Sequence, residues 1–135
     1  MKIKPVDLEA VWDLRHRVMY PGLDPSEVRL PDDAAGRHLA LWIDARPVSV
    51  ISLFNRGSEM QFRKFATETA EQGKGYGSAL LEHVITLAAK EKKTAIWCNA
   101  RLTATALYAR HGMRAFGETW EQYGIGFVKM KKEYN

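Results

Sequence analysis

The sequence predicts a mixed α/β fold with a central sheet that combines parallel and antiparallel strands. Three observations lead to this prediction. A glycine-rich loop runs straight into an amphipathic helix, strand-like segments lie on either side of that loop and helix, and further strand-like segments occupy both flanks. A strand, a helix and a second strand in this order form a right-handed crossover with parallel strands. We therefore expect a mixed sheet with flanking helices.

The first expected element is a helix that begins after Asp7, because aspartate is a preferred N-cap residue. Residues 21–37 then contain three prolines and two glycines, which is typical of an irregular surface segment. A loop of this length often contributes to function. The apolar residues that predict the helix recur at helical spacing and are Leu8, Val11, Trp12, Val18 and Met19.

Three strands are expected in the middle of the chain. The segments HLALWI (38–43) and VSVISLF (48–54) flank a short turn and are typical of an antiparallel hairpin. The segment EMQFRKFAT (59–67) follows a second turn and predicts a third strand.

The helix after the glycines is the strongest periodic signal in the chain. Its apolar face consists of Leu80, Leu81, Val84, Ile85 and Ala88. We expect TAIWCNA (94–100) to form a buried strand, followed by a short helix from about Thr103 to Arg110 that Gly112 can end. Two strands near residues 113–120 and 125–132 complete the prediction.

Length and composition indicate one domain over residues 1–135, large enough to bury a core without disulfides or a metal. The single cysteine, Cys98, excludes an intramolecular disulfide, and the four histidines do not approach a metal-ligand spacing. No apolar run approaches the length of a leader or a membrane span, so we expect a cytoplasmic protein without membrane contact. The net charge of +4 is modest and dispersed, which disfavours nucleic acid as a partner and suits a small anionic ligand.

The most informative motif is the loop QGKGYGS. Glycines permit positive φ and let an anion approach the backbone, and a helix start carries unpaired N–H groups and a partial positive charge. The motif lacks the Lys-Ser/Thr pair of a Walker loop and is not a full G-x-G-x-x-G pattern. Taken alone, it also fits a flexible connection between a strand and a helix. We interpret it as a phosphate-binding loop formed by Gln72, Gly73, Lys74, Gly75, Tyr76, Gly77 and Ser78.

A longer order of motifs surrounds this loop. The pattern Q-x-x-G-x-G stands between a strand and an amphipathic helix, and a strand with Asn99 and the segment ATALYARHGM (104–113) follow it. This order resembles the GNAT acetyltransferase superfamily. The resemblance implies acetyl-CoA as co-substrate, with its pyrophosphate on the loop amides and its pantetheine arm between two splayed parallel strands. It also implies that Asn99 and Tyr108 belong to the acetyl-CoA site.

The segments LRHRVMYPG, HLALW, MQFRKFAT, IWCNAR and LYARHGM are similar to a bacterial branch of this superfamily that includes glyphosate N-acetyltransferase. That branch acetylates small amines that carry an acidic group, so the resemblance implies a small-molecule amine acceptor bound by Arg63 and Arg101. Two positions depart from the branch. Tyr20 stands where the branch has a third substrate-site arginine. Phe127 stands where the branch has a histidine that resembles a general base.

Acyl transfer from a thioester to an amine depends mainly on holding donor and acceptor together. The resemblance makes Tyr108 the general acid for the departing thiolate, and places an oxyanion-stabilising N–H in the stretch Phe65, Ala66 and Thr67. Cys98 lies in an apolar strand, so we expect an inert buried thiol and direct transfer. The general base stays open among Glu118, Glu121, Tyr123, His111 and proton loss to water.

Two other functions stay open at this point. A protein or peptide N-acetyltransferase would bind acetyl-CoA in the same way but would need an open acceptor groove. A CoA-binding regulator would have kept the binding and lost the chemistry. The sequence does not distinguish a monomer from a homodimer.

Overall fold

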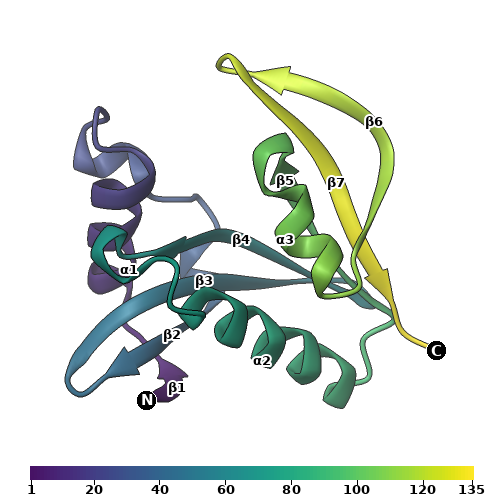
Figure 1. Cartoon of the computed structure of the whole chain (residues 1–135), viewed down its shortest axis with the longest axis horizontal. Coiled ribbons are helices and arrows are strands. Elements are labelled where there is room, and N and C mark those ends of the chain that lie inside the picture. The colour runs from purple at the N-terminus through teal and green to yellow at the C-terminus, as the bar shows by residue number, and fades with distance from the viewer. The chain divides into compact units, whose positions relative to one another are not determined.

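The computed structural model describes residues 1–135 and contains one seven-stranded sheet in the order β1-β2-β3-β4-β5-β7-β6 (Figure 1). Because β5 runs parallel to β4 and antiparallel to β7, the sheet is mixed, and the predicted fold class is confirmed. The strands are β1 (Lys2–Pro5), β2 (Arg37–Ile43), β3 (Arg46–Arg56), β4 (Glu59–Thr67), β5 (Ala95–Arg101), β6 (Arg114–Gln122) and β7 (Ile125–Glu133). The helices are α1 (Leu8–Leu14), α2 (Tyr76–Lys90) and α3 (Thr105–Arg110), with a π-helix η1 (Arg15–Met19) and the 3-10 turns η2 (Pro25–Val28), η3 (Asp33–Ala35), η4 (Thr69–Glu71) and η5 (Leu102–Ala104).

The chain divides into two compact units. Unit 1 consists of residues 1–54 and 63–84, and unit 2 consists of residues 55–62 and 85–135. The strand β4 and the helix α2 each contribute residues to both units. The two units are described separately below.

Unit 1 holds the antiparallel strands β1, β2 and β3, in which Leu39 of β2 lies opposite Ile51 of β3. The short strand β1 was not predicted, because its sequence KIKP is mostly polar and its residues are largely exposed. Its strand form depends on pairing with β2, which is a tertiary effect rather than a local one. A buried cluster joins the helix to the sheet and contains Leu14, Ala40, Val50 and Ala66.

The first helix begins where the sequence predicts, since Asp7 accepts a hydrogen bond from the N–H of Ala10 at 2.8 Å. Its second half differs from the prediction. After Leu14 the chain continues as the wider π-helix η1, which ends at Met19. The predicted irregular segment is confirmed, with two 3-10 turns and no longer element between residues 21 and 36.

A buried ion pair connects this part of unit 1. The guanidinium of Arg15 is fully buried and donates to both carboxylate oxygens of Asp33, at 2.8 and 2.9 Å. It also donates to the carbonyl of Val28 and to the hydroxyl of Ser52. Because an isolated buried charge is very costly, these contacts fix the segment between η1 and β2 against β3.

His38 extends the same network. Its Nε2 lies 2.9 Å from the carbonyl oxygen of Asp33, which can only accept, so Nε2 carries the proton. Its Nδ1 then accepts from Ser52, whose oxygen accepts from Arg15. Both ring nitrogens of His38 are therefore used within the fold, which gives this residue a structural role.

Unit 2 holds the first residues of β4, together with β5, β7 and β6. Met60 of β4 lies opposite Ile96 of β5, and Cys98 of β5 lies opposite Met130 of β7. The helix α3 ends at Arg110, and Gly112, which has a φ of +87°, follows directly after its C-cap residue His111. The strands β6 and β7 form the yellow-green hairpin of Figure 1 and shift register between Phe116 and Trp120.

We predict that Asp33→Asn destabilises the protein strongly, because it leaves the buried guanidinium of Arg15 without its counter-charge. Burial acts to raise the pKa of Asp33, but hydrogen bonds from Arg15, Leu30 and Trp12 outweigh it and lower the pKa from 3.8 to about 2. The ionised carboxylate therefore stabilises the fold at pH values above 3.8, and this contribution is lost as the pH falls from there toward 2.

Urea unfolding at pH 7 should show a loss of roughly 3–5 kcal/mol in the free energy of unfolding for Asp33→Asn. The control is Asp13→Asn, because Asp13 forms an exposed ion pair with Arg17 and should contribute less than about 1 kcal/mol. Equal losses in the two variants would contradict the prediction. Below pH 3 the difference in the free energy of unfolding between wild type and Asp33→Asn should become smaller.

Candidate functional site

Several backbone N–H groups of the glycine loop in unit 1 have no hydrogen-bond acceptor within the protein. Gly73 and Gly75 have φ values of +80° and +86°, which only glycine adopts without strain. Residues 72–75 are exposed, and the N–H groups of Gly73, Lys74 and Gly75 donate to no protein acceptor. The first N–H groups of α2 follow directly and have no partner within the helix. The loop therefore presents a run of unpaired donors at a helix N-terminus.

The base of the loop is braced by side chains. The amide of Gln72 donates to the carbonyl of Thr67 at 3.0 Å, so this residue ties the loop to the end of β4. Glu71 accepts from Arg46 and from Lys74, each at 3.0 Å, and these hydrogen bonds lower its pKa. The carboxylate of Glu71 therefore ties Lys74 of the loop to Arg46 of β3.

Gly77 has a different role from the two glycines before it. A Cβ at Gly77 would lie 3.1 Å from Oγ1 of Thr67 and 3.3 Å from the ring of Phe65. The first turn of α2 therefore lies against the end of β4. The structure therefore brings the glycine loop next to the stretch from Phe65 to Thr67. The sequence resemblance assigned the first to the pyrophosphate of acetyl-CoA and the second to the oxyanion.

The acceptor residues expected in unit 1 are Arg63 and Tyr20. Arg63 is half-buried in β4 and forms no hydrogen bond or ion pair within the protein. Tyr20 follows η1, and its hydroxyl accepts from Nζ of Lys64 at 2.7 Å. Sequence analysis did not select Lys64. The only signal was a second cation directly after Arg63 in the strand, and its contact with Tyr20 is visible in the structure alone.

Tyr108 of unit 2 is 8% exposed, and its ring centroid lies 5.7 Å from that of Phe62. Burial raises the pKa of this phenol well above 10, the neighbouring Cys98 raises it further, and Arg101 acts in the opposite direction. Tyr108 is therefore protonated at neutral pH and is a weaker acid than an ordinary phenol.

The two CoA residues expected in unit 2 do not share a face of β5. Asn99 is exposed, whereas Cys98 is buried and neighbours Tyr108. Because side chains alternate along a strand, Asn99 emerges on the face opposite to that of Cys98. Burial raises the pKa of Cys98 to about 12, so its thiol is inert, as expected.

Arg101 lies opposite Phe127 in the pairing of β5 with β7. The ring of Phe127 stacks on Trp120 of β6, with centroids 5.8 Å apart and an angle of 18° between the planes. An aromatic stack therefore occupies the position where the resemblance had placed a histidine. The other base candidates in β6 and its turn, Glu118, Glu121 and Tyr123, are exposed, and His111 follows α3.

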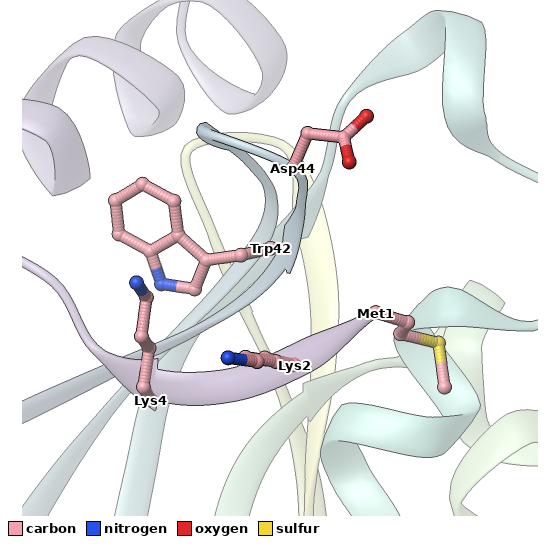
Figure 2. Close-up of a pocket in the computed structure, with 5 residues that line it drawn as sticks. All are labelled: Met1, Lys2, Lys4, Trp42 and Asp44. Atoms are coloured by element: carbon pink, nitrogen blue, oxygen red, sulfur yellow. The ribbon is translucent and has the colours of Figure 1, made fainter.

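Two surface depressions contain none of the predicted site residues. One lies at the β1 edge of unit 1, where Lys4 covers the indole of Trp42 at 4.8 Å (Figure 2). Lys2 lines the same depression, and the carboxylate of Asp44 points away from both ammonium groups in Figure 2. The other lies in unit 2 at the ends of β6 and β7. No three side chains of His, Cys, Asp or Glu converge, and no helix is long and apolar enough to cross a membrane.

The comparison with known families identifies the chain. The acetyltransferase (GNAT) domain matches residues 11–134, nearly the whole sequence. The chain belongs to the GNAT acetyltransferase family. This GNAT protein is 27% identical to the uncharacterized N-acetyltransferase YitI of Bacillus subtilis (strain 168), over 93% of its own length and 91% of that protein. It is therefore an enzyme of the GNAT acetyltransferase type.

Solved structures share the fold of this GNAT protein. A candidate N-acetyltransferase from Lactobacillus plantarum superposes with a TM-score of 0.86 at 22% identity, over 98% of this chain and 99% of that one. A Bacillus subtilis acetyltransferase in complex with CoA superposes with a TM-score of 0.74 at 18% identity, over 99% and 97% of the two chains. At these identities the likeness shows the fold.

Proposed function

We propose that this protein acts as one domain that transfers acetyl from acetyl-CoA directly to the amine of a small acceptor with an acidic group. One observation carries the proposal. A loop of unpaired backbone donors, with two glycines at positive φ, stands at the start of α2 in a GNAT chain. The structural neighbour from Bacillus subtilis holds CoA, which supports acetyl-CoA as the donor here.

In this proposal the N–H groups of residues 73–78 bind the pyrophosphate of acetyl-CoA, where the α2 dipole favours negative charge. Lys74 adds a cation, which pairs with Glu71, and Gln72 holds the loop in place. Asn99 is assigned to the cofactor as well. The backbone N–H groups between Phe65 and Thr67 are the proposed donors to the oxyanion.

The reaction is a single displacement with balanced proton movement. The amine nitrogen attacks the thioester carbon, the new C–N bond forms, and the C–S bond breaks with its electron pair on sulfur. Tyr108 gives its phenolic proton to that thiolate, the proton of the attacking amine leaves to water, and the phenolate regains a proton from water to complete the cycle. Because burial raises the pKa of Tyr108, this transfer needs a thiolate that is itself poorly solvated and therefore basic.

The acceptor's acidic group is assigned to Arg63 and Arg101, and Tyr20 is assigned to acceptor binding as well. A guanidinium binds a carboxylate or phosphonate bidentately, and Arg63 has no acidic partner within the protein. The similarity to the branch that includes glyphosate N-acetyltransferase supports the same acceptor class. We further propose that the protein works in the bacterial cytoplasm as a monomer or homodimer.

Thiol release from acetyl-CoA with a panel of amines tests the proposed function. We expect turnover with small amino acids that carry a second acidic group. Turnover with peptides alone would favour the protein or peptide N-acetyltransferase. Tight acetyl-CoA binding without turnover of any amine would favour the regulator.

We predict that Gly75→Asp weakens acetyl-CoA binding roughly tenfold or more, because it places a carboxylate among the donors that should receive phosphate. The matched control is Gly57→Asp in the turn between β3 and β4, because Gly57 also has positive φ and open space around it. Isothermal titration with acetyl-CoA measures the effect. Equal affinities for the two folded variants would contradict the assignment of the loop.

We predict that Tyr108→Phe lowers turnover by roughly 10²-fold while acetyl-CoA affinity changes little, because the ring remains and the proton donor is lost. The control is Tyr134→Phe, which removes a hydroxyl that donates to the carbonyl of Ile85 at 2.6 Å. That change should lower Tm without a comparable loss of turnover. If Tyr108→Phe keeps full turnover, Tyr108 contributes only to packing and the prediction is wrong.

A further inference from the structure

Lys64 adopts an unusual backbone conformation for a residue inside a strand. Its φ is +53°, in the left-handed region that non-glycine residues rarely occupy. The other non-glycine residues with positive φ, Asp44, Lys92 and Tyr123, lie in turns outside the strands. Such strain persists only where the surrounding structure imposes it, and it concentrates at functional sites.

The side chain of Lys64 is held in one place. Its Nζ donates to the hydroxyl of Tyr20 at 2.7 Å and lies 4.6 Å from the centroid of the same ring. Tyr20 in turn is fixed by the end of η1, since its N–H donates to the carbonyls of Arg15 and His16. The ammonium is therefore positioned by the chain rather than free to move in solvent.

This ammonium has no counter-charge within the protein. Its hydrogen bond and its cation–π contact are both with Tyr20, and no carboxylate forms an ion pair with it. The guanidinium of the adjacent Arg63 is also unpaired. A half-buried cation without an acidic partner gives up hydration and gains no ion pair, and an anionic ligand would supply the missing partner.

We propose that Lys64, held by Tyr20, is a specificity-determining residue that binds the acidic group of the acceptor. The inference rests on the proposed function and adds to it a cation that the sequence did not reveal. It also gives Tyr20 a role. Its phenol orients the ammonium of Lys64, whereas an arginine at this position would bind the acceptor through its own charge.

The spacing along β4 is consistent with this role. Lys64 directly precedes the stretch Phe65–Thr67, whose N–H groups are the proposed oxyanion donors. A strand advances about 3.3 Å per residue, so the anion site and the reacting carbonyl would be separated by about the length of a small amino acid. An acceptor with its acidic group close to its amine fits this separation.

The test compares acceptors that differ only in the acidic group, namely aspartate with asparagine and O-phosphoserine with serine. Lys64→Gln should lower kcat/KM for the acidic member of each pair by roughly 10- to 100-fold, the effect of one charge-assisted hydrogen bond. For the neutral member it should change kcat/KM less than about twofold. Lys64→Arg should retain the selectivity, and Tyr20→Phe should lose part of it.

A second variant separates binding from a structural role. Lys64→Gly removes the ammonium and relieves the positive φ, so its Tm should be unchanged or higher while selectivity for the acidic member is lost. The control is Lys90→Gln, an exposed cation in the last turn of α2, which should match wild type. A fall in Tm with equal losses for acidic and neutral acceptors would show that Lys64 only ties β4 to Tyr20, and would overturn the proposal.

Titration with succinate at fixed ionic strength keeps the two proposals distinguishable. If wild type acetylates no amine but succinate binding is lost in Lys64→Gln, the proposed function fails and the anion site stands. If wild type acetylates acidic amines and Lys64→Gln keeps both the selectivity and succinate binding, the function stands and the role of Lys64 is overturned.

Discussion

The buried ion pair of Arg15 and Asp33 is the contact on which the rest of unit 1 depends. Two charges removed from water are tolerated only when nearly all of their hydrogen-bonding capacity is used, and here the donors and acceptors come from α1, η1, the loop and β3. The pair therefore fixes the path of residues 21–36, which contain little regular structure of their own. It also fixes the end of η1, from which Tyr20 reaches β4.

Two sets of polar groups in unit 1 differ in how fully they are paired. Inside the fold, the side chains of Asp33, Ser52 and His38 all have partners. At the glycine loop and on β4, backbone donors and two cations have no acidic or backbone partner. Unsatisfied groups cost stability unless water or a ligand satisfies them, so their concentration on one strand and the following loop is the physical basis for the proposed binding site.

Local patterns predicted the elements well where a residue's neighbours in sequence decide its conformation. The strand predicted at 59–67 has the same bounds as β4, and the apolar face predicted for α2 is buried. The predictions were less complete where distant contacts decide. The strand β1 forms only by pairing with β2, and the helix after Asp7 widens into η1 at the buried Arg15.

The sequence by itself determined the fold class, the glycine loop before a helix and the family resemblance, because periodicity, glycine content and motif order are local properties of the chain. Only the tertiary structure decided that Asn99 and Cys98 occupy opposite faces of β5, that burial raises the pKa of Tyr108, and that Phe127 stacks on Trp120. It also decided that Lys64 meets Tyr20, 44 residues away in sequence. Charge, burial and pairing between distant residues arise when the chain folds, and for this reason the candidate site required the structure.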